Sequence, residues 1–393
     1  MNGHLRTWIE VDRAAIAHNY RAFRRLIGSK INLVREGTFS DEVKLMAIAK
    51  SNAYGHGLVP YAKLLTTLGA DWLGVDSIVE AQTLRGVGLT IPILVLGYTR
   101  PDNFAAASAA NISLTVSTFE SLAALKNLTK ISSAHPLRLH LKVDTGMRRQ
   151  GFLLSEFPRF LKALKKINRV ARVEGVYSHL AAPSDPKLKS SVKNQIKEFE
   201  NFLNLAAAAG WPRDSLLKHL SATGAALGHP DARYDLVRIG LGLFGLQSSQ
   251  LKSKIVLQPA LTWKTIVSEI KTLPAAGGVG YDLTERVGAG TRLAICPIGY
   301  WHGYPRLLSG VGRVRIKNQF AKIIGRVSMD MIAIDVTKIE KLARRGGGLK
   351  VGDEVVLLDG KKGPTAEELA RLAQTINYEI ITRLNPLIER FYV

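Results

Sequence analysis

Short apolar segments alternate with helical segments over the first 250 residues, and this alternation constrains the fold more than any other feature. The apolar segments are rich in branched residues and end in turn residues, as strands do. The candidate strands are 45–49, 72–75, 93–96, 113–116, 137–143, 173–178, 216–220 and 236–241. Between them lie segments with the apolar spacing of amphipathic helices, among them 78–85, 118–126, 154–166 and 192–208. A further helix is expected at 14–26, before the first strand.

Strand–helix repetition predicts parallel strands joined by right-handed crossovers. Eight such units over about 200 residues fit a (β/α)8 TIM-like barrel better than an open doubly wound sheet. After residue 250 the helical periods fade, and strand-like stretches with glycine-rich turns follow at 261–270, 291–298, 312–316, 321–324, 331–336 and 354–358. A late helix is indicated at 365–374. The expected class is α/β, with an N-terminal barrel over residues 10–250 and a C-terminal mostly β domain over 251–393 that residues 1–9 join.

Charge and cysteine content narrow the function classes. The net charge of +22 would suit nucleic acid, but the basic residues are dispersed, as at Lys162, Lys165 and Lys166, which is typical of solvated helix faces. We therefore expect no specific nucleic-acid partner. No apolar run reaches the roughly 18 residues that span a bilayer, and residues 1–6 open on polar side chains, so we expect a cytoplasmic protein that binds no membrane. With Cys296 as the single cysteine, no disulfide or cysteine metal cluster can form, and no metal site is expected.

Barrels of this kind carry their chemistry at the carboxyl ends of the strands. The first strand ends at Lys50, and a charged amine is costly to bury there. The lysine either becomes neutral, for instance as a Schiff base with an aldehyde cofactor, or extends its amine to the barrel rim. Position alone does not separate these two interpretations.

Polar residues also follow four later strands, at 142–149, 177–179, 219–224 and 238–242. Hydroxyls, glycine amides and helix starts can hold a phosphate, and Thr223 with the amides near Gly240 and Leu241 are candidates for that role. The imidazole of His179 could stack on a heteroaromatic ring. Each residue is a weak signal alone, but several on one rim favour a phosphorylated aromatic cofactor.

The stretch AKSNAYGHG at 49–57 closely resembles the cofactor-lysine motif of bacterial alanine racemases, which are pyridoxal-phosphate enzymes of fold type III. Further blocks resemble the same family in the same order, at 142–149, 177–179, 237–240, 298–300, 325–330, 375–379 and 382–386. The resemblance therefore covers nearly the whole chain.

The resemblance implies a role for each matching position toward pyridoxal 5'-phosphate. Lys50 would hold the cofactor covalently, His179 would lie beside its ring, and Arg238 would face the ring nitrogen. The phosphate would be bound by Tyr54, Thr223, Gly240, Leu241 and Tyr378. Arg149 would reach the phenolic oxygen and be held by Lys142, which is often carbamylated in this family.

The resemblance also implies how the reaction runs. Lys50 and Tyr281 would be the two catalytic bases that interconvert L- and D-alanine, with D-alanine used for bacterial peptidoglycan. Met329, through its backbone amide, and Arg149 would bind the substrate carboxylate, and Tyr300 would line the entrance. Tyr281, Tyr300 and Met329 would come from the partner subunit of a homodimer.

Physical chemistry agrees with these roles. Racemisation removes a proton from one face of Cα and returns one to the other, which two opposed bases do without moving the substrate. An arginine at the ring nitrogen does not readily release its proton, so we expect transamination to be suppressed. The family pattern is broken at Trp301 and His302, where many relatives have alanine and aspartate, so that bulk and a titratable base would stand at the entrance.

Three alternatives remain beside alanine racemisation. Serine, or a wider set of amino acids, could be the substrate, because a small apolar pocket rejects one hydroxyl weakly. A decarboxylase of the same fold type would want an acid at the ring nitrogen, where Arg238 lies. A non-catalytic carrier of the cofactor would lack the second domain, which is present here.

Overall fold

The computed structural model describes residues 5–28, 42–126, 136–167, 170–247, 255–339 and 348–393. The chain divides into two compact units. The first, which we call the barrel unit, comprises Ala17–Ala53 and Leu58–Leu257. The second, the β unit, comprises the residues up to Ile16, Tyr54–Gly57 and Gln258–Val393.

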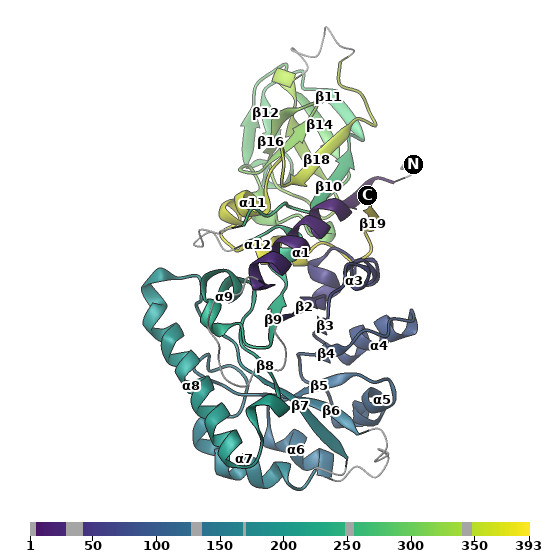
Figure 1. Cartoon of the computed structure of the whole chain (residues 1–393). Helices are drawn as coiled ribbons and strands as arrows, with labels where there is room; N and C mark the ends of the chain where they lie inside the picture. The colour runs from purple at the N-terminus through teal and green to yellow at the C-terminus, as the bar shows by residue number, and fades with distance from the viewer. Residues whose placement is uncertain (1–4, 29–41, 127–135, 168–169, 248–254, 340–347) are drawn as a thin grey trace. The chain divides into compact units, whose positions relative to one another are not determined.

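Eight parallel strands form the sheet of the barrel unit (Figure 1). They are β2 (Lys44–Ile48), β3 (Trp72–Val75), β4 (Ile93–Val95), β5 (Ser113–Val116), β6 (Leu137–Lys142), β7 (Ala171–Tyr177), β8 (Leu217–His219) and β9 (Leu236–Ile239). β2 pairs with β3 on one side and β9 on the other, and a bridge between Ala222 and Arg238 joins the chain after β8 to β9. The sheet is thus a nearly closed barrel, which confirms the predicted TIM-like fold. Leu45–Ile48 of β2 are all apolar and buried, because parallel strands are buried on both faces.

Helices follow the barrel strands and lie outside them (Figure 1). They are α2 (Lys50–Tyr54), α3 (Leu58–Thr67), α4 (Ile78–Gly86), α5 (Phe104–Ala109), α6 (Phe119–Lys126), α7 (Phe157–Leu164), α8 (Lys189–Ala208) and α9 (Thr223–Gly228), preceded by α1 (Arg13–Gly28). The start of α4 is fixed by a capping box, in which Ser77 Oγ accepts the Glu80 N–H and the Glu80 carboxylate accepts the Ser77 N–H.

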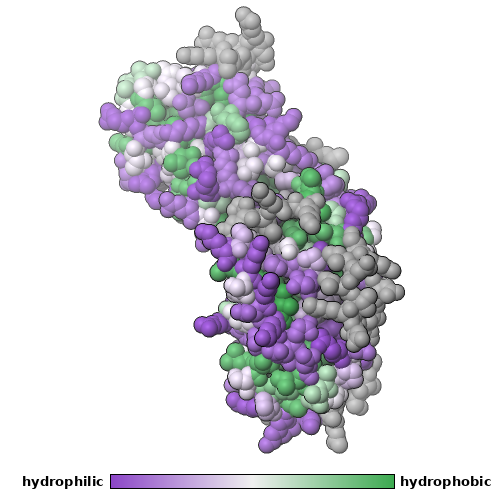
Figure 2. Space-filling view, turned by 60° about the vertical axis from the view of Figure 1, so that its left-hand side comes forward, coloured by the Kyte–Doolittle hydropathy of each residue, from purple (hydrophilic) through white to green (hydrophobic). Residues whose placement is uncertain are grey.

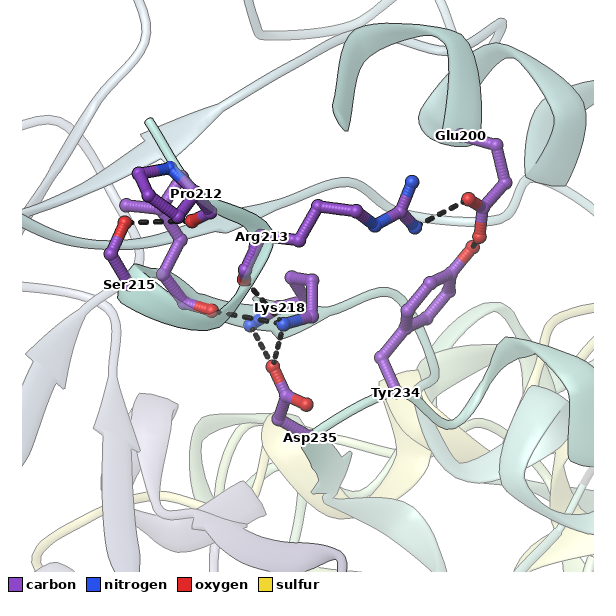
Figure 3. A network of polar contacts seen from close by, with 8 residues as sticks. Glu200, Pro212, Arg213, Ser215, Lys218, Tyr234 and Asp235 are labelled. Carbon is purple, nitrogen blue, oxygen red and sulfur yellow. Dashed lines mark hydrogen bonds and ion pairs between the residues drawn. The ribbon is translucent and has the colours of Figure 1, made fainter. Parts of the chain in front are cut away.

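A buried ion pair joins β8 to β9 near the amino ends of the strands (Figure 3). Lys218 Nζ lies 2.9 Å from Asp235 Oδ2, and the two side chains are only 3% and 4% exposed. The same Asp235 oxygen accepts the Lys218 backbone N–H at 2.8 Å. Around this pair, Lys218 donates to the carbonyl of Arg213, and Glu200 accepts from both Arg213 and Tyr234. The barrel seam therefore depends on side chains as well as backbone hydrogen bonds.

The β unit is built on a mostly antiparallel sheet of order β11-β14-β17-β16-β15-β18-β10-β1-β19. Its strands are β1 (Thr7–Val11), β10 (Leu261–Ile266), β11 (Glu269–Thr272), β14 (Arg292–Cys296), β15 (Arg313–Ile316), β16 (Gln319–Ile324), β17 (Ile332–Asp335), β18 (Glu354–Asp359) and β19 (Glu389–Tyr392). A separate hairpin is formed by β12 (Gly277–Val279) and β13 (Glu285–Val287), and two helices follow, α11 (Ala366–Leu372) and α12 (Asn377–Thr382). β10 alternates buried and half-buried residues, as a strand with one solvated face does.

The surface carries the charge that the composition indicates. On the face shown in Figure 2, hydrophilic residues cover much of the surface of each unit, and hydrophobic residues form small groups scattered among the hydrophilic ones. Among the described residues, no helix is both long and apolar enough to cross a membrane. Cys296 is buried in β14.

Candidate active site

Polar side chains gather at the carboxyl end of the barrel strands, where barrels of this class carry chemistry. They come from strands far apart in the sequence: Lys50 follows β2, Lys142 ends β6, Tyr177 ends β7, His219 ends β8 and Arg238 lies in β9. Parallel strands of a closed barrel bring these ends together, so the fold itself assembles the group.

Tyr177 is the centre of this group. Its ring stacks on the His219 imidazole, with centroids 4.6 Å apart and planes 7° from parallel. Lys142 Nζ lies 5.3 Å from the ring centroid, and the Arg238 guanidinium carbon lies 5.2 Å from it. The hydroxyl shares a hydrogen bond of 2.9 Å with Thr115 Oγ1. Burial raises the pKa of Tyr177 to about 12, so its phenol stays neutral and acts as a packing surface.

Arg238 is clamped by acceptors on both of its terminal nitrogens and is only 3% exposed. Nη1 donates to His219 Nδ1 and to the His219 carbonyl, each at 2.9 Å. Nη2 donates to the carbonyls of Ser178 and Leu220 at 2.8 and 3.0 Å and lies 3.2 Å from His179 Nδ1. Among the described residues, Nε has no hydrogen-bond acceptor. Burial lowers the pKa of Arg238 to about 10, so the group remains a cation at neutral pH.

The electrostatic environment of the barrel end is strongly positive. Burial and the charges of Arg238, Arg149, Lys142 and Lys50 lower the pKa of His179 to about 3. Burial and the neighbouring cations also lower the pKa of Lys142 from 10.5 to about 8. No group of three or more His, Cys, Asp and Glu side chains in the described ranges is arranged to hold a metal ion. This end of the barrel is therefore suited to an anionic organic ligand.

Lys142 and Arg149 do not contact each other through hydrogen bonds. Lys142 Nζ donates to Gln150 Oε1 at 2.9 Å. Arg149 is exposed and donates its backbone N–H to Asp144, but its guanidinium makes no hydrogen bond or ion pair within the described part of the chain. Arg149 is therefore available to a ligand. Lys142 is buried and its pKa is lowered by the charge of Arg149, but no hydrogen bond joins the two side chains.

Lys50 stands at the start of an unusual turn. Ser51, Asn52, Ala53 and Tyr54 all have φ between 51° and 57°, which is a left-handed turn of four non-glycine residues. This conformation costs roughly 1–2 kcal/mol per residue. Lys50 Nζ itself lies 3.8 Å from Asp76 Oδ1, at the end of β3. A strained segment directly after a lysine at a barrel rim is typical of a functional site.

Specific hydrogen bonds hold the left-handed turn. Asn52 Oδ1 accepts the Leu58 N–H at 2.8 Å, and the Asn52 N–H reaches Glu80 Oε1 at 3.3 Å. The other oxygen of Glu80 accepts the Asp76 N–H at 2.8 Å. One carboxylate therefore ties the Lys50 turn, Asp76 and the start of α4 together. Gly55 closes the motif at φ 84°, where an added Cβ would lie 2.1 Å from the Ile381 carbonyl oxygen.

The candidate phosphate groups lie at the ends of β8 and β9. Thr223 begins α9, and the short helix Leu241–Phe244 follows Gly240. Thr223 Oγ1 accepts the Gly240 N–H at 3.2 Å, so two of the three predicted groups are in direct contact. Helix starts present free amides, which favour an anion at this corner of the barrel.

Tyr281 lies in the β unit, at the tip of the β12–β13 hairpin, and is 68% exposed. Gly280 (φ 72°) and Asp282 (φ 60°) flank it in conformations that turn the chain sharply. Arg326 Nε holds Asp282 at 3.1 Å, and Glu285 accepts the Gly325 N–H at 2.9 Å. The hairpin tip is thus anchored on both sides of an open phenol.

Tyr300 and Met329 lie on two adjoining turns of the β unit. The Tyr300 N–H donates to the Ser328 carbonyl at 3.0 Å, and the Trp301 N–H donates to the Met329 carbonyl at 3.1 Å. Tyr300, Trp301 and Met329 are 42%, 50% and 52% exposed. His302, in contrast, is buried, and its Nδ1 accepts the Gly299 N–H at 3.2 Å. The ring of His302 therefore caps its own turn, and its place at an entrance stays a prediction.

Tyr54 and Tyr378 approach each other within the β unit. Their ring centroids are 6.2 Å apart, with planes tilted by 50°. Tyr378 lies in α12 and its hydroxyl-bearing ring is 38% exposed, whereas Tyr54 is 9% exposed. The two phenols that the sequence assigns to one ligand group are thus neighbours.

Sequence reasoning assigned no role to four groups that the structure places at or behind this end of the barrel. They are Asp76, Glu174 and the imidazoles of His140 and His219. A signal existed for the last three, because a histidine or a glutamate in the middle of an apolar strand has to face a polar partner. Which partner each one meets is set by barrel closure and cannot be read along the chain.

Comparisons with known proteins identify the family. The alanine racemase N-terminal domain model matches residues 11–248, and the alanine racemase C-terminal domain model matches residues 260–392. Alanine racemases of Desulforamulus reducens and Symbiobacterium thermophilum are each 37% identical, over 98% and 100% of this chain and 98% of each relative.

Solved structures give the same result. The alanine racemase of Bacillus anthracis with bound L-Ala-P has a TM-score of 0.86 at 30% identity, over 99% of this chain and 95% of that chain. The enzyme of Streptomyces coelicolor also has a TM-score of 0.86 at 30% identity, over 100% and 99% of the two chains. The barrel, the lysine motif and matches over nearly the whole length show that this chain is an enzyme of the alanine racemase family.

Proposed function

We propose that the chain interconverts L- and D-alanine with pyridoxal 5'-phosphate, using Lys50 and Tyr281 as two bases. D-Alanine would supply peptidoglycan synthesis in a bacterial cytoplasm. The observation that carries the proposal is the clamp on Arg238, which engages both terminal nitrogens and leaves the Nε–H without an acceptor in the described part of the chain. Such a donor, in a cluster that also contains Lys50, fits a heteroaromatic ring nitrogen.

The residues at the carboxyl end of the barrel match this cofactor in electrostatic charge as well as in hydrogen-bond donors. Pyridoxal phosphate carries a phosphate and a phenolic oxygen, and the cluster of Lys50, Lys142, Arg149 and Arg238 favours both anions. When bound, the cofactor delocalises the negative charge that remains on the substrate Cα after proton removal.

Each residue would hold one part of the cofactor. Lys50 would hold its aldehyde carbon, His179 would pack beside its ring, and Arg149 would hold its phenolic oxygen. Phosphate would be bound by Tyr54, Thr223, Gly240, Leu241 and Tyr378. Because a guanidinium does not readily release its proton, Arg238 would keep the ring nitrogen unprotonated.

The two bases divide the proton transfers between the two faces of Cα. The Lys50 amine would act on one face and the Tyr281 phenol on the other, each removing a proton in one direction and returning it in the reverse direction. Arg149 and the backbone amide of Met329 would hold the substrate carboxylate, which fixes the position of Cα between the bases. Tyr300 would line the entrance.

We infer a homodimer in which Tyr281, Tyr300 and Met329 of one subunit complete the site of the other. The exposure of these three side chains supports this arrangement, since a phenol that acts as a base on a bound amino acid needs a surface that excludes water. Lys142 would be carbamylated and would then accept hydrogen bonds from Arg149. Its lowered pKa of about 8 supports this, because only the neutral amine adds carbon dioxide.

A substrate panel tests the proposed function. The purified chain, loaded with pyridoxal phosphate, is incubated with both enantiomers of alanine, serine and lysine, and the products are separated on a chiral column. We expect the parent chain to convert either enantiomer of alanine into an equal mixture of both. Lys50→Ala and Tyr281→Phe should leave each enantiomer unconverted. Tyr234→Phe is the matched control, since Tyr234 precedes β9 at the amino end of the strands and bonds to Glu200. Faster turnover of serine would widen the substrate class, loss of the carboxyl group would indicate a decarboxylase, and bound cofactor without turnover would indicate a carrier.

A further inference from the structure

A chain of buried polar groups runs from Arg238 through the barrel core to Glu174. Arg238 Nη1 lies 2.9 Å from His219 Nδ1, and His219 Nε2 lies 2.8 Å from His140 Nδ1. His140 Nε2 lies 3.4 Å from Glu174 Oε2, which is within ion-pair distance but without hydrogen-bond geometry. Both imidazoles are fully buried, and His219 is further held by stacking on Tyr177. We call Arg238, His219, His140 and Glu174 the core relay.

The Arg238 end and the Glu174 end of the core relay favour the same direction for the hydrogen bond between the two imidazoles. A guanidinium can only donate, so His219 Nδ1 has to accept. Burial and the charge of Arg238 lower the pKa of His219 well below its ordinary value, so the ring is neutral and carries its one proton on Nε2. That proton points at His140 Nδ1, which has to accept. Because His140 Nδ1 accepts, the proton of this ring lies on Nε2, toward the Glu174 carboxylate.

The backbone of β7 is shaped to place Glu174 at the end of this chain. Leu139 pairs with Val173 and His140 pairs with Gly175, so Glu174 is an extra residue in a β-bulge, a feature that re-aims a side chain. Gly175 makes room for the imidazole, because an added Cβ would lie 2.6 Å from His140 Nδ1.

The environment of Glu174 keeps its carboxylate charged. It accepts from Ser113 Oγ at 2.8 Å and from Arg138 Nη1 at 3.4 Å, and it lines a hollow of about 610 Å³ near the amino ends of the strands. Burial raises the pKa of Glu174, but the contact with His140, the hydrogen bond from Ser113 and the charge of Arg138 outweigh it and hold the pKa to about 2. Glu174 is thus a permanent acceptor at physiological pH.

We propose that Glu174 is a positioning residue for Arg238, acting through the tautomers of His140 and His219. With the carboxylate present, both rings carry their proton on Nε2 and His219 offers a lone pair to the guanidinium. Without it, only Arg238 favours this arrangement, and the alternative tautomer becomes less unfavourable. In that tautomer His140 Nδ1–H donates to His219 Nε2, and the His219 Nδ1–H faces the N–H groups of Arg238. Any effect of Glu174 on catalysis rests on the proposed role of Arg238 at the ring nitrogen of the cofactor. The tautomers of His140 and His219 do not depend on that role.

Nitrogen-15 spectra of the histidine rings test the relay in the chain without cofactor, and therefore independently of the proposed function. We expect protonated Nε2 and unprotonated Nδ1 for both His140 and His219. Glu174→Leu, which removes the acceptor, should give a mixture of tautomers at His140 and move the Nδ1 resonance of His219 toward the protonated range. Glu174→Gln, whose amide oxygen still accepts, should keep the original pattern.

The matched control is Glu200→Gln, which alters a carboxylate of similar exposure that bonds to Tyr234 and Arg213 instead. It should leave both tautomers unchanged while lowering stability. A protonated Nδ1 at His219 in the parent chain would overturn the proposal, as would unchanged tautomers in a folded Glu174→Leu variant. The parent spectrum decides the matter even if that variant does not fold.

A second measurement uses the loaded enzyme. Glu174→Leu should shift the visible absorption band of the bound cofactor and raise the fraction of turnovers that end in pyruvate, whereas Glu174→Gln and Glu200→Gln should leave both unchanged. If the tautomers respond and the absorption band does not, Glu174 does not act on the cofactor through Arg238 and that half of the proposal is wrong. If no cofactor binds to the parent chain, the proposed function fails while the tautomer result stands.

Discussion

The two units carry their functional residues in opposite ways. In the barrel unit, Arg238 is 3% exposed and its terminal nitrogens are bonded to carbonyls and imidazoles of β7, β8 and the segments that follow them. In the β unit, Tyr281 is 68% exposed at the tip of a hairpin. The barrel set is organised by its own strands, while the hairpin set offers its chemistry outward. A variant in the first set should therefore change the fold and the site together, and a variant in the second should change activity alone.

The largest effect that tests this contrast is expected at the two proposed bases. Lys50→Ala should lose both covalent cofactor binding and racemisation, whereas Tyr281→Phe should keep the cofactor and lose racemisation by about 10²–10⁴-fold, the usual contribution of a general base. In heavy water, Tyr281→Phe should still exchange the Cα proton of one alanine enantiomer, because the amine remains. Proton NMR of the Cα signal measures this exchange. Exchange of both enantiomers at equal rates in Tyr281→Phe would contradict the two-base mechanism.

The next largest effect is expected at the barrel seam of Figure 3. Lys218→Met removes one partner of the buried pair and leaves Asp235 charged in the core, which should cost about 3–5 kcal/mol of unfolding free energy. Denaturant unfolding followed by circular dichroism measures this change. The double variant Lys218→Met with Asp235→Leu is the control and should recover much of the loss. A loss below about 1 kcal/mol in the single variant would mean that water reaches the seam.

The barrel was predictable because several of its strands, such as β3, β4 and β5, are short and mostly apolar runs between turn signals. The sheet of the β unit was predictable only in part. Thr7–Val11 pairs with β10, some 250 residues away along the chain, and nothing local indicates that pairing. The β12–β13 hairpin begins with two glycines, which disfavour strands, so it was missed as a strand although Tyr281 was singled out.

The site shows the same limit. Lys50 and Arg238 could be picked from the sequence because each follows or lies in an apolar strand at the functional end of a barrel. The core relay could not, since His140 and His219 meet across the barrel from strands 79 residues apart. His302 shows what residue type alone leaves out, because the turn uses the ring as its own cap. Residue type and position in the sequence predict which residues belong to the site. Their hydrogen-bond partners depend on how the barrel closes and cannot be predicted in this way.

A smaller, pH-dependent effect is expected at Lys142. Its pKa of about 8 means that the neutral amine, the form that adds carbon dioxide, becomes abundant as the pH rises through 8 and scarce below 7. Carbamylation with ¹³C-bicarbonate, followed by the carbonyl signal in carbon NMR, should therefore increase over that range. Lys142→Gln removes the signal and serves as the control. A signal of equal size at pH 6 and pH 9 would show that burial does not govern this amine.

The smallest effect is expected at the exposed ion pair beside Tyr281, the counterpart of the buried seam pair. Arg326 and Asp282 are 3.1 Å apart with side chains 35% and 65% exposed, and surface pairs of this kind contribute about 0–1 kcal/mol. Arg326→Gln should therefore leave the unfolding free energy nearly unchanged. Asp282 has a positive φ next to Tyr281, so loosening it frees the hairpin tip and should lower kcat a few-fold while cofactor binding stays constant. Steady-state kinetics and a cofactor titration on the same sample separate the two quantities. If Arg326→Gln lowered the unfolding free energy as much as Lys218→Met, the proposed contrast between the buried barrel residues and the exposed hairpin residues would be wrong.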